Sequence, residues 1–199
     1  SWIGVGAVVS NNVSISNGVI VGAGAVVTKD ICSGGGIHGR TCKKDIVIIG
    51  AGGFGREIAW LIEDINKVKN EWNIVGFVDD DESVQGKDIN GYKVIGNINW
   101  LKEQELFVVN AIGNPVIKKK VMDKLDGSKN QYPVLIHPSV IYSERVTFGE
   151  GSIICAGNTL TVDIQIGKHV IINLDSTIGH DSVIGDYSTI LPSVNISGC

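Results

Sequence analysis

The chain has 199 residues, with 17 basic and 21 acidic side chains and a formal net charge of −4. This length allows one or two domains. No apolar stretch approaches the ~20 residues of a membrane span, and no signal peptide opens the chain, so we expect a soluble, cytoplasmic protein. The basic run 118–120 is too short to indicate nucleic-acid binding and favours a solvated helix face.

Residues 1–31 follow a six-residue repeat. From Ile3 the hexads read IGVGAV, VSNNVS, ISNGVI and VGAGAV, with an aliphatic residue first and a small one at the second or fifth place. Such a period predicts stacked rungs of a parallel β-helix, because one rung has no core of its own and buries its aliphatic residues against its neighbours.

Residues 32–43 form a Gly-rich connector without periodicity. Cys32 and Cys42 bracket it. A disulfide between them could form in oxidising buffer and is not expected in a reducing cytosol. His38 and the two thiols lack a suitably spaced fourth ligand, so we expect no metal site.

Residues 44–133 have the pattern of a nucleotide-binding domain. A β-branched run at 45–49 leads into GAGGFG (50–55) and then into a helix pattern. Strand, glycine turn and helix N-terminus form an arrangement that cradles phosphate. A second strand, 74–78, ends at Asp79, where a ribose-binding acid is expected. Further strands are predicted at 94–95, 107–109 and 134–135, with a helix at 115–125. This length suits a nucleotide better than NAD; a purely structural glycine turn is the alternative.

The repeat returns over residues 134–199, with hexads FGEGSI, IGKHVI, INLDST, IGHDSV and IGDYST. The two repeat regions share one phase, since ISGC at the end followed by SW at the start completes a hexad. We therefore predict a parallel β-helix built from both chain ends of a circular permutant, beside a Rossmann-like domain. The pattern resembles the hexapeptide acyltransferases, which implies that the β-helix is left-handed. Two unrelated helical fragments are the alternative.

The combination resembles the PglD/NeuD-type sugar acetyltransferases. The matching motifs are IVIIGAGGFGREIA (46–59), VGFVDDD (75–81), AIGN (111–114), LIHPSV (135–140), INLDSTIGHDSVIGDYSTI (172–190) and VGAGAVVTKDI (21–31). The resemblance implies acetyl-CoA as co-substrate, a nucleotide-sugar acceptor and a homotrimer. The family carries its helix uninterrupted after the nucleotide domain, and the permutation would explain the different order here.

His180 is the predicted catalytic base, because an imidazole that changes charge near neutral pH can take a proton from the attacking amine or hydroxyl. Asp181 could orient it. The resemblance implies these same two roles and adds Asn173, which could instead occupy a left-handed corner. In the family a second histidine often stands nine residues after the base; Thr189 occupies that place here.

The resemblance also implies the binding residues. CoA would contact Gly4, Gly6, Ala7, Gly22, Gly24, Ala25 and Lys29, and the nucleotide sugar would contact Gly50, Gly52, Gly53, Gly55, Asp79, Asp80, Gly113 and Asn114. Three functions stay open: N-acetylation of a UDP-4-amino-sugar type of acceptor, O-acetylation of sialic acid or another sugar hydroxyl, and an engineered trimeric scaffold with incidental or lost activity.

Overall fold

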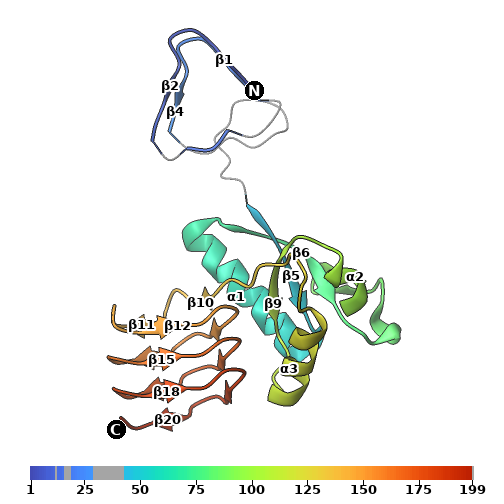
Figure 1. Ribbon diagram of the computed structural model, residues 1–199, viewed down its shortest axis with the longest axis vertical. Helices are drawn as coiled ribbons and strands as arrows, with labels where there is room; N and C mark the ends of the chain where they lie inside the picture. Colours follow the sequence, from blue (N-terminus) through green and yellow to red (C-terminus); the bar gives the residue numbers. More distant parts are fainter. Residues whose placement is uncertain (12, 16–18, 29–42, 199) are drawn as a thin grey trace. The chain divides into compact units, whose positions relative to one another are not determined.

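The computed structural model describes residues 1–11, 13–15, 19–28 and 43–198. The chain divides into two compact units, Ser1–Lys44 and Asp45–Cys199 (Figure 1). None of the helices in these described ranges is long and apolar enough to cross a membrane.

The first unit is made of short parallel strands. They are β1 (Trp2–Ile3), β2 (Val8–Val9), β3 (Ile20–Val21) and β4 (Val26–Val27), and β1 pairs with β3 while β2 pairs with β4. Trp2 lies opposite Ile20, so the pairing offset is three hexads. Gly6 and Gly24 hold corresponding corners with φ of 77° and 72°, a conformation that glycine adopts without steric cost. Short, stacked parallel strands, as the repeat predicts, are present in the described residues of this unit.

The second unit begins with a Rossmann-like α/β domain. Its strand order is β7-β8-β6-β5-β9, in which β5 pairs parallel to β9, β6 pairs parallel to β8, and β7 is antiparallel to β8. The elements are β5 (Lys44–Ile49), α1 (Gly53–Lys69), β6 (Trp72–Val78), the 3-10 turn η1 (Glu82–Val84), β7 (Asp88–Ile89), β8 (Tyr92–Gly96), α2 (Ile98–Lys102), β9 (Phe107–Asn110) and α3 (Pro115–Lys124). The strands predicted at 45–49, 74–78, 94–95 and 107–109 and both predicted helices are confirmed, whereas η1, β7 and α2 were not predicted.

The coil stack follows, in orange to red in Figure 1. Its strands form three parallel sheets, β10-β13-β16-β19, β11-β14-β17-β20 and β12-β15-β18, each with the same three-hexad offset between neighbours. The strands are β10 (Leu135–Ile136), β11 (Ile141–Tyr142), β12 (Thr147–Phe148), β13 (Ile153–Ile154), β14 (Thr159–Leu160), β15 (Gln165–Ile166), β16 (Ile171–Ile172), β17 (Thr177–Ile178), β18 (Val183–Ile184), β19 (Thr189–Ile190) and β20 (Asn195–Ile196). This is the predicted left-handed β-helix. One expectation was wrong: the strand at 134–135 belongs to the coils as β10, because Leu135 pairs with Ile153.

Alternation along each coil strand places one residue inside the stack and the other outside. Ile154, Ile172 and Ile178 fill the interior. In the sheet that starts with β10, the outward residues Leu135, Ile153 and Ile171 are also buried, because they share a core with α1 and the Rossmann-like sheet. This shared core, which the six-residue repeat did not predict, joins the α/β domain to the coils within the second unit.

Candidate active site

His180 and Asp181 lie at an exposed corner of the coil stack, directly after β17 and Gly179. His180 Nδ1 is 2.8 Å from Asp181 Oδ2, and the two side chains are 57% and 59% exposed. Asp181 has φ of 60°, a left-handed conformation that Asp tolerates better than most residues, and it turns the chain here. In the tautomer in which Nδ1–H donates to Asp181, Nε2 carries the lone pair and can accept a proton.

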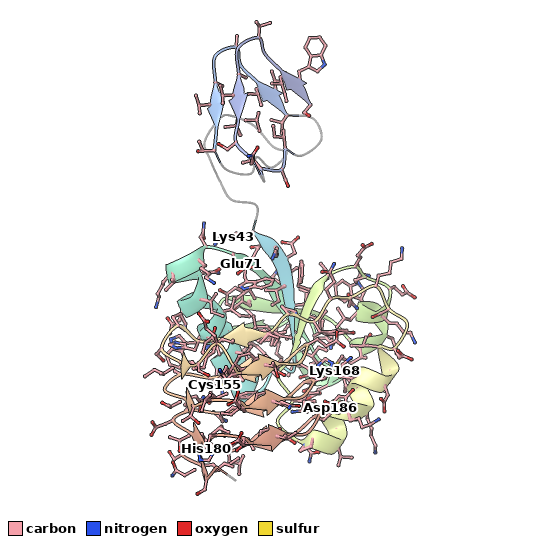
Figure 2. All side chains as sticks on the ribbon, turned by 60° about the vertical axis from the view of Figure 1, so that its left-hand side comes forward. Lys43, Glu71, Cys155, Lys168, His180 and Asp186 are labelled. Atoms are coloured by element: carbon pink, nitrogen blue, oxygen red, sulfur yellow. The ribbon has the colours of Figure 1, made fainter. Side chains whose placement is uncertain are left out.

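The glycine one rung below completes this corner. A Cβ on Gly198 would lie 2.6 Å from both Cδ2 and Nε2 of His180, closer than side-chain contacts allow, so the imidazole packs against a backbone without a side chain. Figure 2 shows His180 near the last coils. Sequence reasoning missed Gly198, although the three-hexad offset from His180 could have identified it.

Asn173 follows β16 and is half-buried. Its N–H donates to the Ile190 carbonyl at 3.0 Å, and its Oδ1 accepts from the Leu174 N–H at 2.8 Å. The left-handed corner of this hexad is Asp175, with φ of 57°, so the alternative of Asn173 as a corner residue was wrong. No hydrogen bond joins Asn173 to His180 within the described ranges. The structure therefore places Asn173 on the same rung and leaves it outside the His180–Asp181 contact.

The glycine turn connects β5 to α1. Gly50 has φ of 97°, and a Cβ on Gly55 would overlap the Gly50 carbonyl oxygen, so both positions require glycine. Gly52 precedes the first turn of α1 and provides no side-chain cap, and a Cβ there would meet nothing within 4 Å. The open turn and the uncapped helix start suit the approach of a phosphate group.

Two acids at the end of β6 bond to nearby backbone. Asp79 Oδ2 accepts the Ala51 N–H at 2.9 Å and its Oδ1 accepts the Asp81 N–H at 3.0 Å, so this carboxylate holds the glycine turn. Asp80 is exposed; its Oδ1 accepts the Ile98 N–H at 3.0 Å and its Oδ2 lies 3.3 Å from Lys124 Nζ. Sequence reasoning predicted both acids near a ligand and did not predict these backbone contacts.

The turn after β9 reaches the same edge of the sheet. Asn114 Oδ1 accepts from the N–H groups of Val116 and Ile117 at 3.0 and 3.1 Å and so caps α3, while Gly113 is exposed beside it. Gly50 donates to Val78, and Ala111 donates to Ile49. The turns after β5, β6 and β9 therefore meet at one sheet edge, the usual place for a ligand in an α/β sheet.

The predicted CoA-contacting glycines and alanines belong to the first unit. A Cβ on Gly4 would overlap the backbone of Ala23, so Gly4 allows its two rungs to stack, and Gly24 donates to Val5 at 3.1 Å. Gly6, Ala7, Gly22 and Ala25 lie in the same two turns. Lys29, and the connector residues Cys32, His38 and Cys42, lie outside the described residues.

One lysine departs from the sequence expectation. Lys118 of the run 118–120 was expected on a solvated helix face, but its side chain is fully buried between α3 and the coils. Burial lowers the pKa of its ammonium group to about 8. Burial also raises the pKa of the Cys155 thiol to about 12, which makes this cysteine a packing residue and not a nucleophile.

The Rossmann-like domain and the coils that follow it match a family of acetyltransferases. The model of the PglD N-terminal domain matches residues 45–125. GDP-perosamine N-acetyltransferase of Escherichia coli O157:H7 is 30% identical over 154 residues, which cover 76% of this chain and 69% of that protein. UDP-N-acetylbacillosamine N-acetyltransferase of Bacillus subtilis (strain 168) is 31% identical over 117 residues, which cover 57% of this chain and 52% of that protein.

Among solved structures, a variant of perosamine N-acetyltransferase from Caulobacter crescentus in complex with CoA and GDP-perosamine is similar with a TM-score of 0.67. It is 28% identical, and the match covers 77% of this chain and 71% of that one. This chain belongs to the PglD-type family of sugar acetyltransferases.

Proposed function

We propose that this protein transfers the acetyl group of acetyl-CoA to the amino group of a nucleotide-linked amino sugar, with His180 as general base. The observation that carries the proposal is the exposed imidazole of His180, whose Nδ1 lies 2.8 Å from Asp181 Oδ2 and whose Nε2 has no hydrogen-bond partner among the described residues. The relatives named as N-acetyltransferases of GDP-perosamine and UDP-N-acetylbacillosamine support the class of acceptor.

The chemistry is a direct acyl transfer. His180 Nε2 removes a proton from the amine as its nitrogen bonds to the thioester carbonyl carbon, and Asp181 stabilises the imidazolium that forms. The carbonyl oxygen gains negative charge, which a backbone N–H of a neighbouring coil stabilises. The C–S bond then breaks and the departing CoA sulfur receives the proton, so no acyl-enzyme forms. Asn173 lies on the same rung as the base and is proposed to contact the acceptor.

The nucleotide sugar is proposed to bind at the sheet edge that carries the turns after β5, β6 and β9. Gly52 and Gly53 let the diphosphate approach the start of α1, and Gly50 and Gly55 shape the turn. Asp79 acts by holding that turn through Ala51. The exposed Asp80, Gly113 and Asn114 then line the site on either side. A UDP-linked 4-amino sugar is the acceptor that we predict, and a GDP-linked one is the competing candidate.

The remaining predictions concern assembly. We propose a homotrimer with acetyl-CoA bound between neighbouring coil stacks, contacted by the turns at 4–7 and 22–25 and by Lys29. Circular permutation remains a prediction that rests on the common phase of the two repeat regions. Light scattering on the purified protein would test the trimer, and a single monomeric species would contradict it.

The decisive experiment is acetyl transfer to a panel of UDP- and GDP-linked 4-amino sugars, followed by the release of free CoA. We expect turnover that His180→Ala lowers by about 10²- to 10⁴-fold, the usual contribution of a general base. A wild-type protein that acetylates only a sugar hydroxyl, such as that of sialic acid, would overturn the amine acceptor. Full activity of His180→Ala would overturn the assignment of the base.

A further inference from the structure

Lys118 joins α3 to the coil stack through its ammonium group. Its Nζ lies 3.0 Å from Oγ1 of Thr189, the first residue of β19, and 3.2 Å from the carbonyl oxygen of Ser188, which directly precedes this strand. The side chain is fully buried, and within the described part of the chain no carboxylate lies at ion-pair distance from it. Two neutral acceptors therefore hold a buried cation.

This arrangement is a poor device for stability. A buried charge loses its hydration, and without a counter-ion little of that cost is recovered, so an apolar side chain of similar volume would serve the fold at least as well. The acceptors do not depend on Lys118 either. The Ser188 carbonyl also accepts the Ile171 N–H at 3.0 Å, and Thr189 is a half-buried residue. What Lys118 adds over an apolar side chain is the direction of its two hydrogen bonds, which fixes α3 relative to the start of β19.

The contact lies between the two parts of the proposed site. On one side, the Lys118 N–H donates to the Asn114 carbonyl at 2.8 Å, one helical turn from the nucleotide-binding edge. On the other side, the Ser188 carbonyl binds Ile171 of β16, and Asn173 two residues later donates to the Ile190 carbonyl of β19. A short series of bonds thus runs from the capping residue of α3 to the rung that carries Asn173 and His180.

We infer that Lys118 is a positioning residue for acetyl transfer, which fixes α3 and its nucleotide-binding end relative to the catalytic rung. The inference rests on the proposed function, since it assigns the distance between the two halves of that same site to one buried amine. Lys118 does not touch the reacting atoms. A change there alters where the amino sugar is presented, and misplacement by about 1 Å can cost about 100-fold in rate.

The test compares Lys118→Met with Lys120→Met, an exposed lysine of the same helix that serves as matched control. For Lys118→Met we expect kcat/KM for the nucleotide sugar to fall by about 10- to 100-fold. UDP or GDP binding measured by calorimetry should stay within about twofold, because the glycine turn is unchanged. The melting temperature at pH 7.5 should be unchanged or higher. Thr189→Val should reduce the rate in the same direction, and the double variant should be no worse than Lys118→Met alone.

Either of two outcomes in the kinetic and melting measurements overturns the inference. One is Lys118→Met kinetics within about twofold of Lys120→Met; the other is a loss of activity accompanied by a lower melting temperature, which indicates a purely structural residue. Hydrogen exchange of α3 is measured in the same variants and needs no substrate. Faster exchange in Lys118→Met than in Lys120→Met is expected, and equal exchange overturns the inference. If the wild-type protein transfers no acetyl group, the proposed function is contradicted. The hydrogen-exchange result would still show whether Lys118 fixes the position of α3.

Discussion

Gly198→Ala should lower kcat by about 10- to 100-fold without unfolding the protein. The added methyl carbon would lie 2.6 Å from His180 Cδ2 and Nε2 and 2.8 Å from Cε1. Carbon contacts are most favourable at about 3.5–4.0 Å, so the imidazole or the last coil must move by about 1 Å. The φ of Gly198 lies outside the left-handed region, so alanine is compatible with the backbone itself. The strain therefore falls on His180.

A displaced ring loses its productive geometry. His180 is exposed and can rotate away, but rotation breaks the 2.8 Å contact with Asp181 and moves Nε2 away from the acceptor. A misplacement of about 1 Å corresponds to a loss of about 10- to 100-fold in kcat. Because the ring moves into solvent and not into the core, we expect a stability change of less than about 1 kcal/mol.

The assay is steady-state acetyl transfer with CoA release, together with urea unfolding of the same preparations. Gly185→Ala is the matched control, because a Cβ at Gly185 would meet nothing within 4 Å and this glycine also follows a coil strand. Activity of Gly198→Ala within about twofold of Gly185→Ala would refute the reasoning. So would an equal loss of activity in both variants, since that would show a general intolerance of side chains at the coil corners.

Three further predictions follow from the same coils. Asp181→Asn should lower kcat by about 10-fold or more, because the neutral amide cannot stabilise the imidazolium. The control is Asp163→Asn, at the same corner one rung earlier, which should leave kcat unchanged. Equal kcat values for the two variants would contradict the pairing of Asp181 with His180. Asn158→Ala should cost about 2–4 kcal/mol of unfolding free energy, because the buried Asn158 amide bonds to the Cys155 carbonyl at 2.7 Å and the Ser176 N–H at 2.8 Å; an unchanged urea midpoint would contradict this. The third concerns pH. Burial lowers the pKa of Lys118 from 10.5 to about 8, so the unfolded chain binds more protons than the folded one between these values, and stability rises with pH there. In urea unfolding, the free energy of unfolding of the wild type should rise by about 2 kcal/mol more than that of Lys118→Met between pH 7.5 and pH 9.5. Buried His169 has a lowered pKa and titrates on the acidic side, and Tyr132 has a raised pKa, so only the difference from Lys118→Met isolates this lysine.

The coil repeat also determines which residues lie next to one another on successive rungs. With three hexads per rung, a residue of the coils has its neighbours on the adjacent rungs at fixed offsets in the sequence. Gly198 under His180 is one case, and Asp163 above Asp181 is another. Mutational studies of β-helices can therefore use the residue at the same position of a neighbouring rung as a control.

The sequence by itself determined the local structure. The hexads specify the coils because each aliphatic residue must be buried by the rungs beside it. GAGGFG specifies the strand-to-helix turn because Gly50 needs a positive φ and Gly55 has no room for a side chain. The pairing of His180 with Asp181 also followed from adjacency, since neighbouring residues at a corner can reach each other. Each of these features depends on residues close in sequence or on a strict period.

The tertiary structure alone decided what happens between elements. The burial of Lys118 could not be predicted, because a Lys-Lys-Lys run on a helix appears solvated until the coils that cover it are in place. Asp79 appeared to be a ligand-binding acid, and its bonds to Ala51 emerged only when the strands β5 and β6 lay side by side. Likewise β10 was assigned to the wrong sheet, because a two-residue aliphatic segment fits either pairing and its partner Ile153 lies three hexads away. Side-chain contacts between distant segments are set by packing, and the hydrophobic pattern of each segment does not encode which partner it meets.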